Sequence, residues 1–387
     1  MKLAERVNKL SSSPTLAITS KAKQLKNSGI DVVSFGAGEP DFDTPQNIKD
    51  AAVAALTAGF TKYTPSTGIP ELKAAIIEKL KKDNGLTYDP AQIVVGCGAK
   101  HSLYNIFQVI CDKGDEVIIP LPYWVSYPQM VDVALGTSVF VQTSENNSFK
   151  ITPEQLKAAI TDKTKILIIN SPSNPTGCVY NREELEQIAD IAVKHNLFVI
   201  SDEIYEKLIY DGKEHVSIAS LNEKIYNLTF TVNGLSKAYS MTGWRIGYLA
   251  GPKEAVAKIS NLQDHSTSCP NSIAQKAAVA AIMTGEDFIV TMRDEFVKRR
   301  DYIVERISAI NKLSVVKPQG AFYVFCNISK TGLDSLTFAS RLLDEAKVAV
   351  IPGIGFGDDS YVRLSFATSI EQITKGLDRI EQWVSSL

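Results

Sequence analysis

The stretch Val232–Tyr248 reads VNGLSKAYSMTGWRIGY, and it decides how we interpret the rest of the chain. It overlaps an apolar, β-branched run at Asn227–Val232 and a second apolar run at Trp244–Ala250, so we expect two buried strands joined by a short loop. The loop is rich in glycine, serine and threonine, which tolerate tight backbone conformations. The sequence therefore predicts that Lys237 lies on a short polar connection between two strands.

A lysine in this position suits covalent chemistry. An amine held among strand ends loses hydration, its pKa falls, and it can form a Schiff base with a carbonyl compound. The hydroxyl of Ser236 and the guanidinium of Arg245 suit a phosphate group, which accepts several charge-assisted hydrogen bonds. A lysine beside a phosphate site is what pyridoxal 5'-phosphate requires. The alternative, from this stretch alone, is an ordinary loop with a solvated lysine.

Length and composition describe an ordinary globular protein. The chain has 387 residues, of which 44% are hydrophobic and 22% charged, enough for two domains with substantial cores. The net charge of −2 and the lack of basic blocks argue against nucleic acid as a partner. No apolar run reaches the ~18 residues of a membrane span. The N-terminus lacks an apolar signal-peptide core, so we expect no membrane partner and no export signal.

The cysteines and histidines show no metal-binding or disulfide pattern. Five cysteines without a CxxC pair and four scattered histidines without an HExxH motif indicate neither zinc nor a disulfide framework. We therefore expect no metal, a reduced cytoplasmic setting, and histidines at the surface or behind the site.

Apolar runs and helical patterns alternate from about residue 45 to residue 250. The runs expected as strands, besides the two that flank Lys237, are Gln92–Val95, Glu116–Ile119, Ser138–Gln142, Lys165–Asn170 and Leu197–Ser201. This alternation predicts an α/β architecture, with a mostly parallel, doubly wound sheet and helices on both faces. Thr44 and Pro45 are expected to cap and begin the first helix of this part.

The C-terminal part of the chain has a different pattern. Residues 272–310 are helical with a break near Thr284-Gly285, and strand-like runs, helices and a glycine loop follow. We expect this α+β unit to pack with residues 1–44, so that the second domain is discontinuous. The predicted division is a large α/β domain over residues 45–285 and a small α+β domain made of residues 1–44 and 286–387.

Candidate ligand-binding residues follow the predicted strands. Asn174, in a turn with two X-Pro bonds, Asp202 and Lys237 each come after a buried strand. Because the carboxyl ends of parallel strands meet at one edge, we expect these residues to gather where doubly wound sheets bind ligands. The segment 96–100, GCGAK, joins a strand to a helix N-terminus, which suits an anion. It matches neither the Walker A nor the GxGxxG pattern, and a plain tight turn is the alternative.

Three further features admit either a ligand or a structural role. Trp124 stands at a strand end among prolines, where it either stacks on a flat ring or fills the core. The glycine-rich loop at Val33–Pro45 either approaches a ligand or connects two domains. Arg363 lies in the alternating run Tyr361–Phe366, and by pattern alone it is a solvent-facing residue.

These segments resemble the class I aminotransferases, fold-type-I enzymes that use pyridoxal phosphate, and above all the bacterial aspartate aminotransferase subgroup. The likeness covers essentially the whole chain, and its segments occur in the family's order: GAGEPDFDTP, TKYTPSTGIPEL, PYWVSYP, NSPSNPTG, SDEIYE, SKAYSMTGWRIGY, GAFYVF and YVRLSFATS. The resemblance implies a mixed sheet and a homodimer with shared active sites. It also implies transfer of an amino group from an L-amino acid, with L-aspartate the best candidate, to 2-oxoglutarate by a ping-pong exchange.

The resemblance implies roles for the residues around the cofactor ring. Lys237 binds the cofactor covalently and moves the substrate's proton, and Asp202 pairs with the pyridinium nitrogen. Tyr205 and Asn174 bind the ring's phenolic oxygen, and Trp124 stacks on the ring. Asp202 and Tyr205 are thus counted with Lys237 as catalytic.

The resemblance also implies where the two anionic groups bind. The phosphate is expected to lie against Gly98, Ala99, Lys100, Ser236 and Arg245, and against Tyr63 from the other subunit. The substrate's α-carboxylate is expected to meet Gly38 and Arg363, with Trp124 and Asn174 beside it.

The substrate remains open at this stage. Relatives that accept prephenate carry a lysine where this chain has Ser11-Ser12-Ser13, and the arginine that reads a second carboxylate in the animal-type enzymes has no clear counterpart near residues 264–267. An aromatic or alanine aminotransferase, or a β-lyase, would use the same cofactor residues. A cofactor-sensing transcription regulator would need a DNA-binding domain, for which residues 1–44 are too short and too weakly basic.

Overall fold

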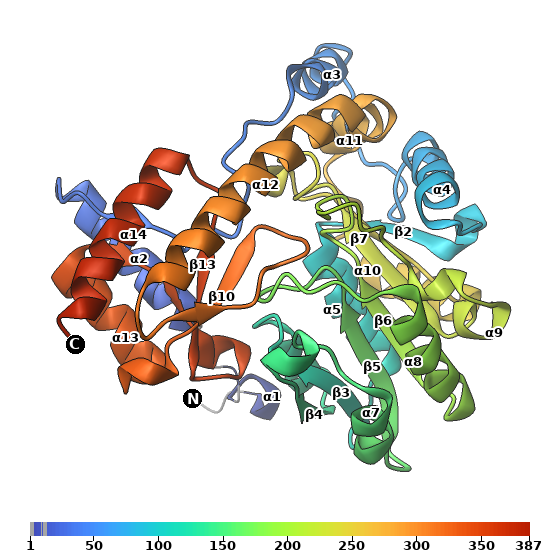
Figure 1. Ribbon diagram of the computed structural model, residues 1–387. Coiled ribbons are helices and arrows are strands. Elements are labelled where there is room, and N and C mark those ends of the chain that lie inside the picture. Colours follow the sequence, from blue (N-terminus) through green and yellow to red (C-terminus); the bar gives the residue numbers. More distant parts are fainter. Residues whose placement is uncertain (1–3, 9, 11–13) are drawn as a thin grey trace.

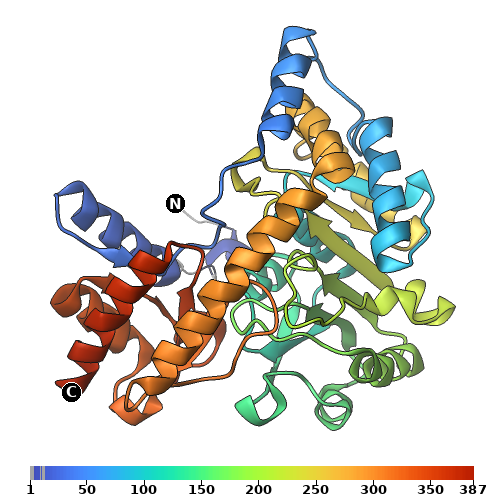
Figure 2. The ribbon, with the colours of Figure 1, turned by 45° about the horizontal axis from the view of Figure 1, so that its top comes forward.

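The long helix α12 (Glu286–Ala309) runs between two packed regions of the chain. The computed structural model describes residues 4–8, 10 and 14–387. In Figure 1 the larger region, on the right, holds a central sheet with its helices, and the smaller region, on the left, holds the C-terminal strands and helices together with α2 (Pro14–Asn27). Figure 2 shows α12 running diagonally between the two regions.

The larger region is built on a seven-stranded sheet. Its strands lie in the order β2 (Ile93–Gly96), β8 (Gly247–Ala250), β7 (Thr229–Gly234), β6 (Phe198–Asp202), β5 (Thr164–Asn170), β3 (Glu116–Leu121) and β4 (Thr137–Gln142). β8 is antiparallel to both of its neighbours, whereas the other neighbouring strands pair in parallel. The mixed, mostly parallel sheet that the sequence predicted is confirmed.

Helices bury both faces of this sheet. Alternate residues of each strand point to opposite faces, so each strand contributes side chains to both layers. In β5, Ile166 and Ile168 pack on one face, and Leu167 and Ile169 pack on the other. One face is covered by α5 (Ala99–Ile110), α6 (Tyr127–Val133) and α10 (Lys253–Asp264). The other is covered by α7 (Pro153–Ala159), α8 (Arg182–Lys194), α9 (Glu223–Tyr226), α3 (Gln46–Thr57), α4 (Pro70–Asn84) and α11 (Ser272–Thr284). The result is a doubly wound α/β layer structure.

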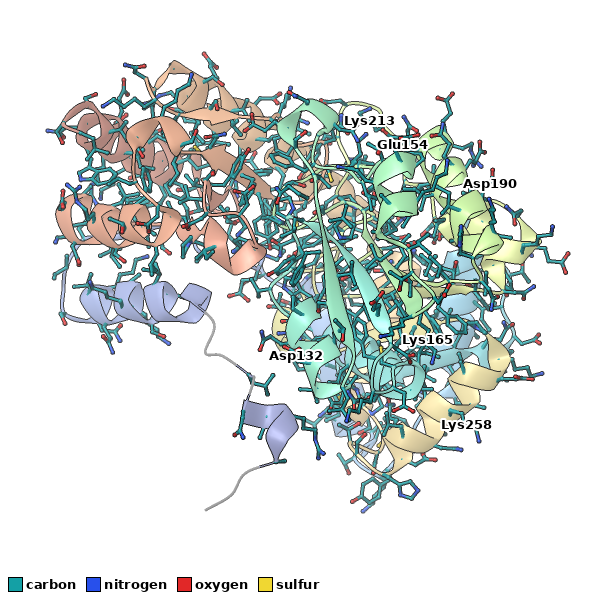
Figure 3. All side chains as sticks on the ribbon, turned by 90° about the horizontal axis from the view of Figure 1, so that it is seen from below. Asp132, Glu154, Lys165, Asp190, Lys213 and Lys258 are labelled. Atoms are coloured by element: carbon teal, nitrogen blue, oxygen red, sulfur yellow. The ribbon has the colours of Figure 1, made fainter. Side chains whose placement is uncertain are left out.

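The outer surface of the larger region carries charged side chains of both signs. Figure 3 labels six of them: Asp132, Glu154, Lys165, Asp190, Lys213 and Lys258. Among the described residues, no helix is both long and apolar enough to cross a membrane.

The smaller region has its own sheet and core. β12 (Ile351–Pro352), β13 (Tyr361–Ser365), β10 (Tyr323–Asn327) and β9 (Ser314–Val315) form an antiparallel sheet, and β1 (Val33–Ser34) pairs in parallel with β11 (Val348–Ala349). Its core includes side chains from α2, α12, α13 (Ser335–Arg341) and α14 (Ile370–Ser385). The N-terminal residues Ile18 and Val33 belong to this core, while α1 (Glu5–Asn8) lies near α6. The domain boundaries after residues 44 and 285 stay a prediction.

The predicted start of α3 is wrong by one residue. The helix begins at Gln46, Pro45 takes the N-cap position, and no described side chain caps it. The hydroxyl of Thr44 donates instead to the carbonyl oxygen of Ser240 at 2.6 Å, and it accepts from the indole N–H of Trp244 at 3.0 Å. A hydroxyl expected to serve its own helix therefore ties the N-terminal segment to the loop that carries Lys237.

Two predicted strands are shorter than expected. The run at Trp244–Ala250 is a strand only from Gly247, because Thr242–Trp244 forms a 3-10 turn and Arg245 adopts a left-handed conformation with φ of 56°. Among the strand-like runs expected after residue 310, the apolar run Val348–Ile351 divides between β11 and β12, which belong to different sheets. An apolar run predicts burial, but which strand it pairs with depends on distant parts of the chain.

Candidate active site

A cavity of about 500 Å³ lies at the carboxyl edge of the seven-stranded sheet and is closed on one side by the smaller region. Eleven of the thirteen residues predicted for the site line it: Gly38, Ala99, Lys100, Trp124, Asn174, Asp202, Tyr205, Ser236, Lys237, Arg245 and Arg363. Gly98 lies directly behind this lining, and Tyr63 lies elsewhere. The convergence expected from the strand ends is therefore present.

Lys237 lies on the turn after β7 and is half-buried. Its ammonium donates to the carbonyl oxygen of Gly38 and lies 5.9 Å from the ring centres of both Tyr205 and Phe322. Burial lowers the pKa of Lys237 to about 8, and the positive charge of Arg363 acts in the same direction. The amine is thus easier to deprotonate than a solvated lysine, which a nucleophile or a proton carrier requires.

Asp202 ends β6 and is only 4% exposed. The hydroxyl of Tyr127 donates to its Oδ2 at 2.7 Å, and the N–H of Ile204 donates to Oδ1 at 3.3 Å. Burial raises the pKa of Asp202 to about 6, although both hydrogen bonds act to lower it. A buried carboxylate of this kind suits a cationic partner in the cavity, such as a protonated ring nitrogen.

Two side chains next to Asp202 were not predicted. Tyr127 is completely buried in α6, three residues after Trp124. Asn170, the last residue of β5, lines the cavity, donates to the backbone carbonyl of Asp202 at 2.9 Å, and accepts from the N–H of Asn174 at 2.9 Å. The position of Asn170 at a strand end was the available signal, whereas Tyr127 had none beyond its place in the PYWVSYP segment.

Tyr205 is paired with a second tyrosine that was also missed. Its hydroxyl lies 3.0 Å from the hydroxyl of Tyr323, at the start of β10, and both rings are buried. Burial and the neighbouring Tyr323 raise the pKa of Tyr205 well above its usual value. Both phenols therefore stay protonated, and one can donate to an oxygen in the cavity.

The N-terminus of α5 forms an anion-binding corner. Gly98 is the N-cap of α5 with φ of 92°, and no side chain in the described part of the chain caps this helix. A Cβ at this position would lie 2.4 Å from Nη2 of Arg245. Arg245 donates to the carbonyl oxygens of Thr242 at 2.8 Å and Cys97 at 3.3 Å. Ser236 lines the same cavity. Uncapped N–H groups beside a guanidinium suit a phosphate.

The Lys100 side chain contacts Trp124. Its ammonium lies 4.8 Å from the ring centre of Trp124, and burial lowers its pKa, with the charge of Arg245 acting in the same direction. Its backbone N–H belongs to the first turn of α5, while its side chain is a separate cation in the cavity.

The solvent-facing orientation that pattern alone predicted for Arg363 is wrong. The side chain is 7% exposed and lies 4.3 Å from the ring centre of Tyr323. Its Nη1 donates to Oδ1 of Asn174 at 3.0 Å, its Nη2 donates to the carbonyl oxygen of Gly36 at 3.2 Å, and its Nε has no partner among the described residues. The alternation of β13 points Arg363 at the larger region because that region covers this face of the small sheet.

Tyr63 does not reach the cavity of its own chain. It is 93% exposed, on the loop between α3 and α4. Other exposed apolar side chains lie on α3 and α11, which pack against each other: Val53, Leu56 and Met283. Ser11–Ser13, on which the prephenate argument depended, lie outside the described residues, and no described residue of the cavity lining comes from positions 264–267.

The chain is similar along its length to known proteins. The model of the family described as aminotransferase class I and II matches residues 30–380. An aspartate aminotransferase from Bacillus sp. (strain YM-2) is 55% identical over 387 residues, which cover 99% of each chain. Among solved structures, the aspartate aminotransferase from Rhizobium meliloti has a TM-score of 0.96 at 40% identity and covers 100% of this chain and 99% of that one. The aspartate aminotransferase from Thermus thermophilus with maleate has a TM-score of 0.95 at 45% identity and covers 99% of each.

Proposed function

The chain belongs to the class I and II aminotransferase family, and from that premise we propose that it moves the amino group of L-aspartate to 2-oxoglutarate by a ping-pong exchange on pyridoxal 5'-phosphate. The observation that carries the proposal is one cavity that joins a lysine of lowered pKa, a buried aspartate and a buried arginine. These are Lys237, Asp202 and Arg363. Amino transfer needs a nucleophilic amine, an anion that keeps a ring protonated, and a grip on a carboxylate.

The residues of the cavity fit the cofactor. Its lining includes four cationic side chains, Lys100, Lys237, Arg245 and Arg363, against two acidic ones, Glu39 and Asp202. This excess of positive charge suits a ligand set with a phosphate and carboxylates. The uncapped helix at Gly98 and the lack of a Cβ there support the phosphate end.

We assign the cofactor contacts from these positions. The phosphate would be held by N–H groups at Gly98, Ala99 and Lys100, by Ser236 and Arg245, and by Tyr63 from a second subunit. The ring would lie between Trp124 and the end of β6, with Asp202 at its nitrogen and with Tyr205 and Asn174 at its phenolic oxygen. Lys237 would hold it covalently.

The side chains divide the chemistry between them. When bound, pyridoxal phosphate withdraws the electrons left on the substrate's Cα after its proton leaves. Asp202, ionised above pH 6, would keep the ring nitrogen protonated. Lys237 has a pKa of about 8, so its neutral amine is accessible near neutral pH, and it would carry the proton away from Cα. Tyr205 would donate a hydrogen bond that steadies the ring.

Arg363 and Asn174 would fix the substrate. The guanidinium is already oriented by Asn174 and by the carbonyl of Gly36, and its Nε is free among the described residues. A buried guanidinium can hold the α-carboxylate with two parallel hydrogen bonds, which orients the Cα–H bond. The N–H of Gly38 is the second contact that we assign to this carboxylate.

The preference for aspartate would come from a second cation. Once Arg245 serves the phosphate and Arg363 the α-carboxylate, Lys100 is the remaining ammonium in the lining besides Lys237. Its ammonium lies over the Trp124 ring, and its positive charge would attract a side-chain carboxylate of the substrate. The similar Thermus thermophilus structure was solved with maleate, which is a dicarboxylate.

We further propose a cytoplasmic homodimer with sites shared between subunits. Tyr63 is exposed, and so are apolar residues of α3 and α11, as expected for surfaces that a second copy covers. All five cysteines are free, which suits a reducing compartment.

A donor screen tests the function. The full-length protein, loaded with pyridoxal phosphate and supplied with 2-oxoglutarate, should form oxaloacetate and glutamate in equal amounts from aspartate, with a higher kcat/KM than for alanine or phenylalanine. Lys100→Met should lower kcat/KM for aspartate by about 10-fold or more and leave alanine nearly unchanged. If kcat/KM is higher for phenylalanine or alanine than for aspartate, the proposal that aspartate is the preferred donor is wrong. Pyruvate and ammonia without an acceptor would indicate a lyase.

A further inference from the structure

The turn after β6 presents side chains to two opposite sides. Asp202 and Tyr205 line the cavity, whereas Glu203 and Glu206 are buried away from it. The N–H of Glu206 donates to the carbonyl oxygen of Glu203 at 2.9 Å, and the N–H of Glu203 donates to the carbonyl oxygen of Val232 at 2.9 Å. Asp202 is the last residue of β6 and Glu203 follows it directly, so their side chains point in opposite directions. Because the four residues share one short segment, contacts that fix the two glutamates also restrict Asp202 and Tyr205.

The glutamates belong to a buried group that we call the polar anchor: Lys79, Asn84, Glu203, Glu206 and His215. Glu203, 1% exposed, accepts hydrogen bonds from His215 Nε2 at 2.8 Å and from Asn84 Nδ2 at 3.2 Å. It also accepts from the hydroxyls of Ser201 and Ser217 at 2.7 and 2.6 Å. Glu206 pairs with Lys79 and accepts from Asn84 at 2.7 Å. The anchor thus ties the turn to α4 and to the segment that carries His215.

The charges within the polar anchor balance each other. Burial acts to raise the pKa of Glu206, but the charges of Lys79 and His215 outweigh it and lower the pKa to about 2. Burial acts to lower the pKa of His215, but the charge and hydrogen bond of Glu203 outweigh it and raise the pKa. One possible ligand atom from each of Glu203, Glu206 and His215 lies within 4.8 Å of the other two, as the atoms around a metal would. Here, however, the ammonium of Lys79 supplies the positive charge.

A cluster of this kind is a poor device for stability alone. Replacing buried ion pairs by apolar side chains of similar volume is often neutral or stabilising, because each buried charge is costly to desolvate. What such a network provides is a defined geometry, because each of its hydrogen bonds has a set partner; Nδ1 of His215 is the buried side-chain atom of the anchor that has no partner among the described residues. In this chain the geometry that it defines is that of the turn bearing Asp202 and Tyr205.

We propose that the polar anchor is a positioning device for the aminotransfer site: it holds Asp202 and Tyr205 in register with the cofactor ring from the far side of their shared turn. The inference rests on the proposed function. Glu203 is its central positioning residue, because it carries the largest number of the hydrogen bonds. A displacement of the turn by about 1 Å would cost on the order of 100-fold in rate.

The test is Glu203→Gln in the full-length, cofactor-loaded protein. The amide keeps the shape of the side chain but removes its charge, and its N–H2 group must face either the donors His215 and Asn84 or two serine hydroxyls that would have to accept instead of donate. We expect kcat with aspartate to fall about 10- to 100-fold, with KM close to the parent's because Arg363 lies on β13. The pH midpoint of the absorbance change of the bound cofactor should shift, since Asp202 acts on the ring. Glu184→Gln is the matched control: that carboxylate caps α8 and pairs with Lys150 outside the cavity, so both readouts should stay parental.

A second pair of variants decides the matter if Glu203→Gln does not fold. His215→Gln keeps an N–H donor for Glu203 and should retain the parental absorbance midpoint and kcat, whereas His215→Leu should shift both. Parental midpoints and kcat in Glu203→Gln or His215→Leu, with a loss of thermal stability alone, would overturn the positioning role. Failure of the proposed function is separate, because the parent itself would then bind no pyridoxal phosphate or transfer no amino group from aspartate.

Discussion

The hydroxyl of Tyr127 donates a 2.7 Å hydrogen bond to Oδ2 of Asp202, and both side chains are buried. Asp202 therefore has a fixed orientation before any ligand arrives. It also stays more acidic than burial alone would allow, because this hydrogen bond lowers its pKa. The bond joins α6 to the end of β6, where Asp202 lines the cavity.

Tyr127→Phe should weaken catalysis by removing this bond. A hydrogen bond to a charged group contributes about 1.5–3 kcal/mol, so kcat/KM for aspartate should fall about 10- to 100-fold. The acid limb of the pH profile should move to higher pH, because the pKa of Asp202 rises further without the donor. Tyr123→Phe, which alters a tyrosine stacked on Phe140, is the control. An unchanged acid limb would mean that Tyr127 does not act on Asp202.

Asp202→Asn should stabilise the cofactor-free protein, and the same substitution should abolish most of the activity of the cofactor-loaded protein. The folded-state pKa of Asp202, about 6, lies above the ordinary 3.8. Its contribution to stability is thus fully present below pH 3.8 and is lost as pH rises through 6. Asparagine does not ionise, so the mutant's advantage in free energy of unfolding should grow between about pH 5 and pH 8 by on the order of 1 kcal/mol. Thermal or urea unfolding at several pH values measures it, and an advantage that shrinks with pH would contradict the assignment.

Arg363→Gln should affect every amino donor alike. Truncating one partner of a desolvated charge pair costs roughly 2–5 kcal/mol, so kcat/KM should fall about 30- to 5000-fold. Arg363→Lys should recover only part of this loss, because lysine lacks the planar fork. Cofactor absorbance should persist in both variants. A mutant that loses aspartate but keeps alanine would place Arg363 at the side-chain carboxylate instead.

A hybrid-dimer experiment tests whether Tyr63 acts across subunits. A Tyr63→Phe protein with weakened cofactor binding is mixed with an inactive Lys237→Ala protein and allowed to exchange subunits. If Tyr63 serves the neighbouring site, one site of each hybrid carries neither lesion, and parental cofactor affinity should reappear. If Tyr63 serves its own subunit, each hybrid site carries one lesion, and the mixture should show no such recovery.

Much of the fold followed from local patterns. Runs such as Lys165–Asn170 are apolar on both faces, which is typical of the central strands of a doubly wound sheet, and β5 occupies this place. Because ligands bind at the carboxyl ends of such strands, Asp202 and Lys237 could be assigned to one site before the structure was known. The position of these two residues depends on the topology of the sheet, and the order of strands and helices along the sequence predicts that topology.

Side-chain partners were harder to predict, because they depend on contacts between distant segments. Nothing local distinguishes Tyr127 from the other thirteen tyrosines, yet it is the one that reaches Asp202. The alternation around Arg363 indicated only that its side chain points to the opposite face of the strand from its two neighbours. That face is buried because the larger region packs against it. Thr44 has the local sequence features of a helix N-cap, but its hydroxyl donates a hydrogen bond to the carbonyl oxygen of Ser240 instead. His215 likewise gave no hint of its place in the polar anchor.

The most direct test of the central claim is to find where the cofactor is attached. The full-length protein is incubated with pyridoxal phosphate, reduced with borohydride, digested and examined by mass spectrometry. We predict a pyridoxyl group on the peptide that contains Lys237, and loss of that label in Lys237→Ala. Stoichiometric labelling of another lysine in place of Lys237, such as Lys100 in the same cavity, would contradict the account.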